Sequence, residues 1–118
     1  MRVGLGLPVS GTWATPETLR HVAVAADERG FASLWTFQRL LHPVDEDWGA
    51  AYHSVLDPLT SLGYAAAVTS RIRLGVAVVM APYYAPIVLA KALTTLDVLS
   101  DGRLDVGLPG RDSELGFL

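Results

Sequence analysis

The chain has 118 residues, of which 51% are hydrophobic and 18% are charged. This balance excludes a disordered chain and fits a single domain over residues 1–118. Nine basic against twelve acidic residues give a net charge of −3, so a surface for nucleic acid or for an anionic membrane is not expected. The chain has no cysteine, which excludes disulfides, thiolate metal sites and cysteine nucleophiles.

The apolar segments are too short for a membrane protein. The longest apolar run, residues 74–82, falls well short of the ~20 residues that a membrane-spanning helix needs. Arg2 is followed by glycines and prolines rather than by a continuous apolar segment, so a signal peptide is not expected. The sequence therefore predicts a cytoplasmic protein.

Four short apolar segments alternate with three helical ones along the chain. The predicted strands are residues 3–7, 31–37, 72–80 and 104–108. The predicted helices begin at Thr15-Pro16, at Asp57-Pro58 and at Pro86. A polar cap followed by proline satisfies the first helical turn, which is why the first two positions predict helix starts. The order βαβαβαβ predicts an α/β fold made of parallel βαβ units.

Two sheet architectures fit this order of elements: an open doubly wound sheet and part of a (βα)8 barrel. The dinucleotide-binding pattern of an open sheet is missing, because Val9 stands where a third glycine would follow Gly4 and Gly6. Residues 107–113 lack the Gly-Lys-Ser/Thr ending of a phosphate-binding loop. The local pattern leaves the two architectures undecided.

Three longer stretches carry a recognisable combination of motifs. They read ETLRHVAVAADERGFASLWTFQRLLHP (17–43), DPLTSLGYAAAVTSRIRLGVAVVMAP (57–82) and LAKALTTLDVLSDGRLDVGL (89–108). In this order and spacing they resemble the luciferase-like monooxygenase superfamily of flavin- or F420-dependent barrel oxidoreductases. The resemblance implies TIM-barrel-type (βα) units, about half of a (βα)8 barrel with four parallel strands. From Pro109 the sequence reads PGRDSELGFL and departs from the family pattern.

The resemblance also implies where a cofactor is bound, since the active sites of such barrels lie at the carboxyl ends of the strands. Ala77 and Val78 match the positions that pack against the flavin or deazaflavin ring, often through a non-proline cis peptide bond. Gln38 and Arg39 stand where many relatives carry an acid and a histidine. Neither residue can act as a general base, but Arg39 can hold an anionic group and Gln38 can bond to a ring edge. Arg111 is a candidate phosphate ligand.

Each of these positions has a simpler interpretation, and no catalytic residue is identified. Ala77 and Val78 fit an ordinary buried strand, Arg39 fits a solvated loop, and Arg111 fits a frayed end. Tyr83 and Tyr84 follow the third strand and are expected to line the mouth, whereas Trp35 is expected in the core. The histidines and acidic residues of the long loop at 38–55 match no metal motif, so a metal site is not predicted.

Two functions remain open at this level. The resemblance implies an oxidoreductase that acts on a small-molecule substrate with F420, or alternatively with reduced FMN and oxygen. The run at 35–39 and the segment at 96–108 resemble the F420 branch more closely. The alternative is a non-catalytic half barrel, a remnant or an assembly module. Because half of the barrel mouth is missing, weak binding of either cofactor is expected.

The same half barrel has consequences for assembly. It exposes two sheet edges, at residues 3–7 and 104–108, and unpaired edges are templates for further pairing. The sequence therefore predicts a homodimer. In one version strand one of each copy lies beside strand four of the other, and in a second version two half sheets cover each other's apolar faces.

Overall fold

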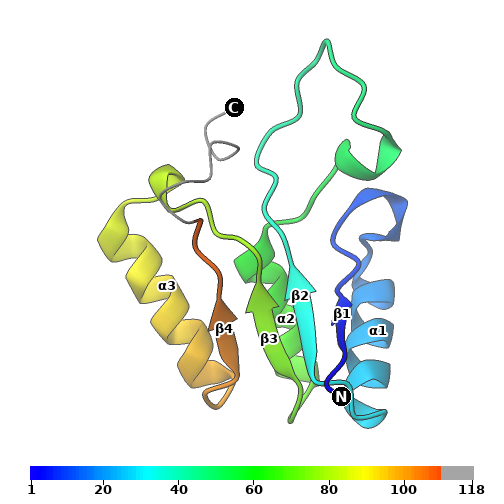
Figure 1. Ribbon diagram of the computed structural model, residues 1–118, viewed down its shortest axis with the longest axis vertical. Helices are drawn as coiled ribbons and strands as arrows, with labels where there is room; N and C mark the ends of the chain where they lie inside the picture. Colours follow the sequence, from blue (N-terminus) through cyan, green and yellow to red (C-terminus); the bar gives the residue numbers. More distant parts are fainter. Residues whose placement is uncertain (110–118) are drawn as a thin grey trace.

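A computed structural model describes residues 1–109 and contains one four-stranded parallel sheet (Figure 1). Its strands are β1 (Gly4–Gly6), β2 (Ser33–Thr36), β3 (Arg73–Val76) and β4 (Leu104–Val106), and they lie side by side in that order. The connecting helices are α1 (Pro16–Glu28), α2 (Pro58–Val68) and α3 (Pro86–Leu99). The order 1-2-3-4 excludes an open sheet wound from its centre, and it confirms the prediction of a half barrel.

The predicted helix starts are confirmed by their caps. The Thr15 hydroxyl accepts a hydrogen bond from the Thr18 N–H at 3.1 Å, and the Asp57 carboxylate accepts one from the Thr60 N–H at 2.8 Å. Gly30 follows α1 with a φ of +76°, a conformation that favours glycine. The strands are shorter than predicted, because beyond Val76 the chain makes single backbone bonds to its neighbours and no regular ladder.

Alternation along the strands places the core on the helical face of the sheet. Leu34 and Leu74 are fully buried there and pair across β2 and β3. Trp35 was expected in the core, and this expectation is wrong, since the side chain is 36% exposed. It alternates with the buried Leu34 and Thr36 and so projects from the opposite face. There the indole covers Gly75, at which a Cβ would come within 2.4 Å of the ring.

A buried carboxylate closes the end of the fold at which the strands begin. Asp27 lies at the end of α1 and accepts hydrogen bonds from three consecutive backbone N–H groups that precede β3. The donors are Ser70 at 2.9 Å, Arg71 at 3.1 Å and Ile72 at 2.8 Å. Burial opposes ionisation of this carboxyl, but the three N–H donors and the nearby charge of Arg71 outweigh it and lower the pKa of Asp27 below its usual range.

A buried arginine binds the carbonyl oxygens of the same segment, the residues that precede β3. Arg103, just before β4, donates to five oxygens with its Nε, Nη1 and Nη2 atoms. The acceptors are the carbonyl oxygens of Ala66, Thr69, Ile72 and Ser100 and the hydroxyl of Thr69, at 2.6 to 3.2 Å. Ala66 and Thr69 belong to the end of α2, where helical carbonyls have no partner within the helix. Arg103 therefore joins the end of α2 to the starts of β3 and β4.

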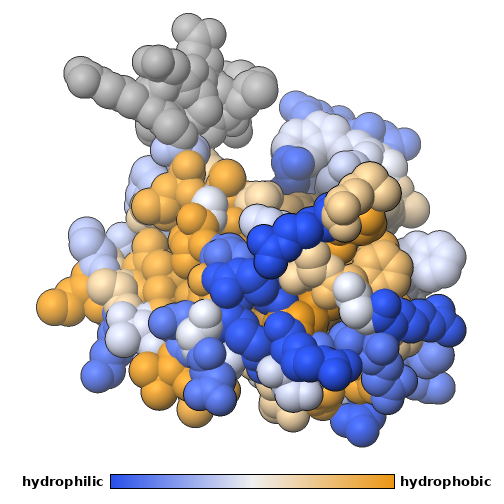
Figure 2. All heavy atoms as spheres, turned by 60° about the horizontal axis from the view of Figure 1, so that its bottom comes forward, coloured by the Kyte–Doolittle hydropathy of each residue, from blue (hydrophilic) through white to orange (hydrophobic). Residues whose placement is uncertain are grey.

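Hydrophilic and hydrophobic side chains occupy different parts of the outer surface. With the starting ends of the strands turned toward the viewer, hydrophilic side chains gather over that end, and hydrophobic ones cover the flank on which α3 lies (Figure 2). On the open face of the sheet, Arg73 and Asp105 form a bidentate ion pair with two contacts of 2.7 Å. Among the described residues, none of the helices combines the length and the apolar character that a membrane crossing requires.

Substitution of Arg103 by lysine should destabilise the fold. Lysine carries its three donors on one nitrogen atom. It cannot reach all the oxygens that the three nitrogen atoms of the planar Arg103 guanidinium contact. We expect Arg103→Lys to lower the free energy of unfolding by ~1–3 kcal/mol, because buried carbonyls lose their donors. Urea denaturation measures this loss. Arg20→Lys, on the exposed side of α1, is the matched control, and equal stability of the two variants would contradict the assigned role.

The pH dependence of stability should report on Asp27. Its folded pKa lies below the ordinary value of 3.8, so its contribution is complete above that value and is lost as the pH falls through the folded pKa. Asp27→Asn should lower stability at neutral pH by ~1–3 kcal/mol and flatten the loss of stability below pH ~4. Asp45→Asn, at an exposed loop position, should change neither quantity. An acid profile unchanged by Asp27→Asn would contradict this prediction.

Candidate functional site

The loops that follow β1, β2 and β3 lie at one end of the sheet, the upper end in Figure 1. The loops after β1 and β2 are tied together by backbone bonds of 2.8 Å, from the Gly11 N–H to the Ser54 carbonyl and from the Leu56 N–H to the Val9 carbonyl. After β3, the Ala77 N–H donates to the Thr36 carbonyl at 2.9 Å. These bonds fix the loop bases next to one another, as the barrel architecture requires of an active-site face.

The end of β3 carries the two positions assigned to the cofactor ring. The peptide bond between Ala77 and Val78 is cis, as the resemblance implies. Ala77 is exposed and Val78 is half-buried, whereas Val76 before them is fully buried. Gly107 approaches them closely, since a Cβ there would lie 2.9 Å from the Val76 carbonyl oxygen and 3.2 Å from Val78 Cγ1. Glycine at 107 therefore lets the backbone after β4 pack closely against the end of β3, where a side chain would be too close to the Val76 carbonyl.

Gln38 connects the end of β2 to the loop after β3. Its Oε1 atom accepts a hydrogen bond from the Met80 N–H at 2.7 Å, and its Nε2 atom donates to the Tyr84 hydroxyl. Both ends of the amide thus contact protein groups. Sequence reasoning placed Tyr84 near the mouth but did not foresee this contact, because 46 residues separate it from Gln38.

Arg39 is enclosed by the long loop after β2 rather than extended into solvent. Its guanidinium carbon lies 4.5 Å from the centre of the Trp48 ring and 5.3 Å from that of Tyr52, within the range of cation–π attraction. The Nε atom is buried and has no hydrogen-bond partner among residues 1–109. The solvated-loop interpretation of Arg39 is therefore wrong. Sequence analysis did not predict the contacts of Arg39 with Trp48 and Tyr52, because these residues follow no regular spacing in the loop.

Two histidine rings lie against each other in the same loop, with their planes tilted by 43°. The rings of His42 and His53 have centroids 4.4 Å apart, and His42 also meets the Trp48 ring edge to face at 5.5 Å. His53 lies 3.9 Å from the exposed carboxylate of Asp47. Within residues 1–109, no three histidine or acidic side chains are grouped so that they could hold a metal ion. Arg111, the remaining candidate, lies outside the described residues.

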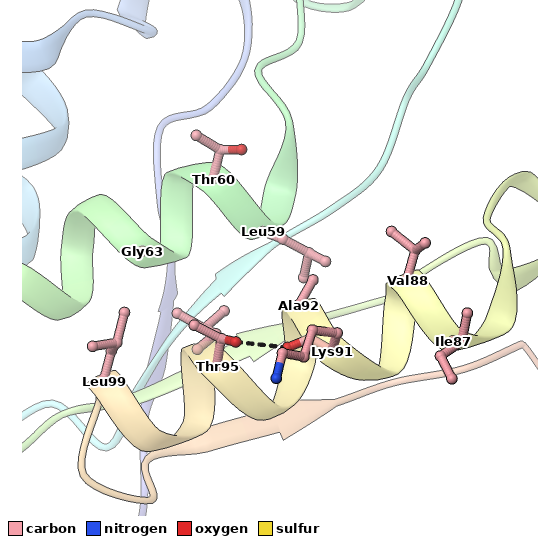
Figure 3. A pocket seen from close by; sticks show the side chains of 10 residues that line it. Leu59, Thr60, Gly63, Ile87, Val88, Lys91, Ala92, Thr95 and Leu99 are labelled. Carbon is pink, nitrogen blue, oxygen red and sulfur yellow. Dashed lines mark hydrogen bonds between the residues drawn. The ribbon is translucent and has the colours of Figure 1, made fainter.

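An apolar groove of about 670 Å³ runs along the outer wall, between α2 and α3 (Figure 3). Leu59 and Gly63 border it on α2, and Ile87, Val88 and Leu99 border it on α3. It lies on the outer face of the helices, and its lining is predominantly apolar. We therefore assign the candidate site to the strand ends.

Parallel strands joined by helices, with loops converging at the carboxyl ends, define a (βα)-barrel enzyme scaffold. Comparison with known sequences specifies the class. The family described as luciferase-like monooxygenase matches residues 2–111, and the chain belongs to this family.

Three relatives illustrate how much of the family the chain covers. An uncharacterized protein of Mycobacterium tuberculosis is 39% identical over 92% of this chain and 41% of its own length. The F420-dependent glucose-6-phosphate dehydrogenase of Kineococcus radiotolerans is 32% identical over 88% of this chain and 30% of its own length. The crystal structure of monooxygenase RslO1 from Streptomyces bottropensis has a TM-score of 0.71 at 32% identity, covering 91% of this chain and 32% of that one. The chain thus spans between 30% and 41% of the length of these relatives.

Proposed function

We propose that this chain binds coenzyme F420, or alternatively FMN, at the carboxyl ends of its strands and serves hydride transfer to or from a small organic substrate. The observation that carries the proposal is the exposed Ala77–Val78 peptide beside Gly107, with the Arg39 cation in the adjacent loop. Similarity to an F420-dependent dehydrogenase favours F420. When bound, either cofactor would supply the ring that carries the hydride.

The residues present fit such a group in two respects. Ala77 at the end of β3 is exposed and Val78 is half-buried, so this peptide offers a surface on which a flat ring can rest, and Gly107 adds no side chain beside it. F420 and FMN also carry a phosphate, and an arginine whose Nε atom is buried without a partner supports binding of an anion. Trp48 and Tyr52 hold the guanidinium in place, so little side-chain entropy is lost when an anion binds.

We propose, as a second function, that two copies of the chain associate through their sheet edges. β1 and β4 each have a partner on one side only, and unpaired strand edges invite pairing. Val3, Val106 and Leu108 on or beside these strands are exposed. Two copies joined edge to edge would contribute the eight strands of a closed barrel. This arrangement also fits the alternative function of a non-catalytic assembly module.

Cofactor binding is tested by tryptophan fluorescence titration with F420 and with FMN. We expect saturable but weaker than micromolar binding, because residues 1–109 supply four of the eight strand ends that surround the mouth of a complete barrel, with F420 bound more tightly than FMN. Arg39→Ala should weaken binding by about tenfold, the effect of losing one charge-assisted contact. Arg29→Ala, at the exposed end of α1, should leave it unchanged. Absence of saturable binding for both cofactors would contradict the proposal.

Self-association is tested by sedimentation equilibrium at micromolar concentration. We expect the mass of two chains, and Val106→Lys should shift the mass toward one chain because a charge at a strand edge blocks pairing. Ile87→Glu, on the groove between α2 and α3, should leave the dimer intact. A stable monomer would contradict edge pairing, and so would dissociation caused by Ile87→Glu alone.

A further inference from the structure

The hydrogen bond between Gln38 and Tyr84 has a fixed direction. The Met80 N–H lies 2.7 Å from one end of the Gln38 amide, and a backbone N–H can only donate. That end is therefore the carbonyl oxygen Oε1, and the other end is the NH2 group. Because an amide nitrogen donates and does not accept, the Tyr84 oxygen is the acceptor of the bond from Gln38. The assignment follows from the contacts of both ends of the amide, so no flipped alternative satisfies them.

This direction leaves the hydroxyl hydrogen of Tyr84 available. A phenol has one hydrogen to donate, and it cannot point at the NH2 group that already donates to the same oxygen. Within residues 1–109, the Tyr84 hydroxyl takes part in one hydrogen bond, which it accepts from Gln38. Tyr84 is half-buried, with its ring against the core and its N–H bonded to the Ala81 carbonyl at 3.0 Å. The hydroxyl is thus held at the strand ends with one unused hydrogen.

The other titratable side chains near Gln38 have different neighbours. Tyr52 lies against the Arg39 guanidinium, and the rings of His42 and His53 lie against each other in the long loop. Gln38 cannot transfer a proton, and a guanidinium does not serve as a general acid. Tyr84 is therefore the titratable residue that contacts Gln38, next to the loop that leads away from Ala77 and Val78.

We propose that Tyr84 donates its hydroxyl hydrogen to the carbonyl oxygen of a small substrate, and that Gln38 is a positioning residue that keeps this hydrogen directed at the ligand. The inference rests on the proposed cofactor site. In reduction, the carbonyl carbon gains a hydride, with its two electrons, from a reduced deazaflavin or flavin. The π electron pair of the C=O bond then forms an O–H bond with the Tyr84 proton, and water reprotonates the phenolate. The product is a secondary or primary alcohol.

The test uses fluorine NMR of the full chain labelled with 3-fluorotyrosine, which detects weak binding at millimolar ligand. The Tyr84 resonance is assigned by its absence in Tyr84→Phe. With F420 present, cyclohexanone should shift the Tyr84 resonance, whereas methylcyclohexane, which has no acceptor oxygen, should not. Tyr83, an exposed neighbour, provides the matched control resonance. Tyr84→Phe should weaken cyclohexanone binding by about threefold to tenfold, the effect of one hydrogen bond, and Tyr83→Phe should not.

Gln38→Glu separates the positioning role from a merely structural one. A carboxylate still accepts the Met80 N–H, but its second oxygen would accept the Tyr84 hydrogen instead of donating to the oxygen. We expect this variant to fold, to bind F420 and to lose the cyclohexanone-dependent shift at Tyr84. The inference is overturned, and the proposed cofactor site retained, if F420 binds but cyclohexanone moves Tyr83 and Tyr84 equally or moves neither. Failure of F420 to bind overturns both.

Discussion

The segment between α2 and β3, residues 69–72, is held from two sides, and the rest of the sheet depends on it. Its N–H groups donate to the buried carboxylate of Asp27, and its carbonyl oxygens accept from the buried guanidinium of Arg103. Ile72 at the end of this segment is buried, and a buried backbone group left unpaired costs ~1–3 kcal/mol, a sizeable share of the ~5–15 kcal/mol stability of a domain. The Asp27 carboxylate on α1 and the Arg103 guanidinium before β4 therefore fix the position at which β3 begins.

The position of β3 relative to its neighbouring strands in turn sets the geometry at the carboxyl ends of the strands. In register, Leu74 pairs with Leu34 on one side and with Leu104 on the other, and the carboxyl ends of the strands then bring Gln38, Ala77 and Gly107 to one level. The bidentate pair of Arg73 with Asp105 adds to this register on the open face. Its hydrogen bonds and charge lower the pKa of Asp105 against the opposing effect of burial. The pair is half exposed, so solvent screening keeps its contribution small.

In the site that we propose, anion binding and proton donation are assigned to different residues. Arg39 supplies a charge held between two aromatic rings, whereas Gln38 is neutral and bonded at both ends. A neutral amide between a backbone N–H and a phenol transmits no charge, but it determines which way the phenol hydrogen points. This is a positional rather than an electrostatic use of the residue, and it is consistent with a site in which the cofactor carries the chemistry.

The sequence by itself determined the order of elements and the helix starts, because caps, prolines and apolar periodicity are local properties of the chain. The barrel-type fold followed from the family resemblance, since the local pattern fitted an open sheet equally well, and the same resemblance predicts that Ala77–Val78 and the residues after β2 belong to the functional end. Only the tertiary structure decided that Trp35 lies on the open face, since the phase of a short strand depends on which neighbours cover it. Likewise, the contacts of Gln38 with Tyr84 and of Arg39 with Trp48 join residues from separate parts of the loops. Irregular loops have no periodicity from which such contacts can be predicted, so these depend on where the packed sheet places the loop bases.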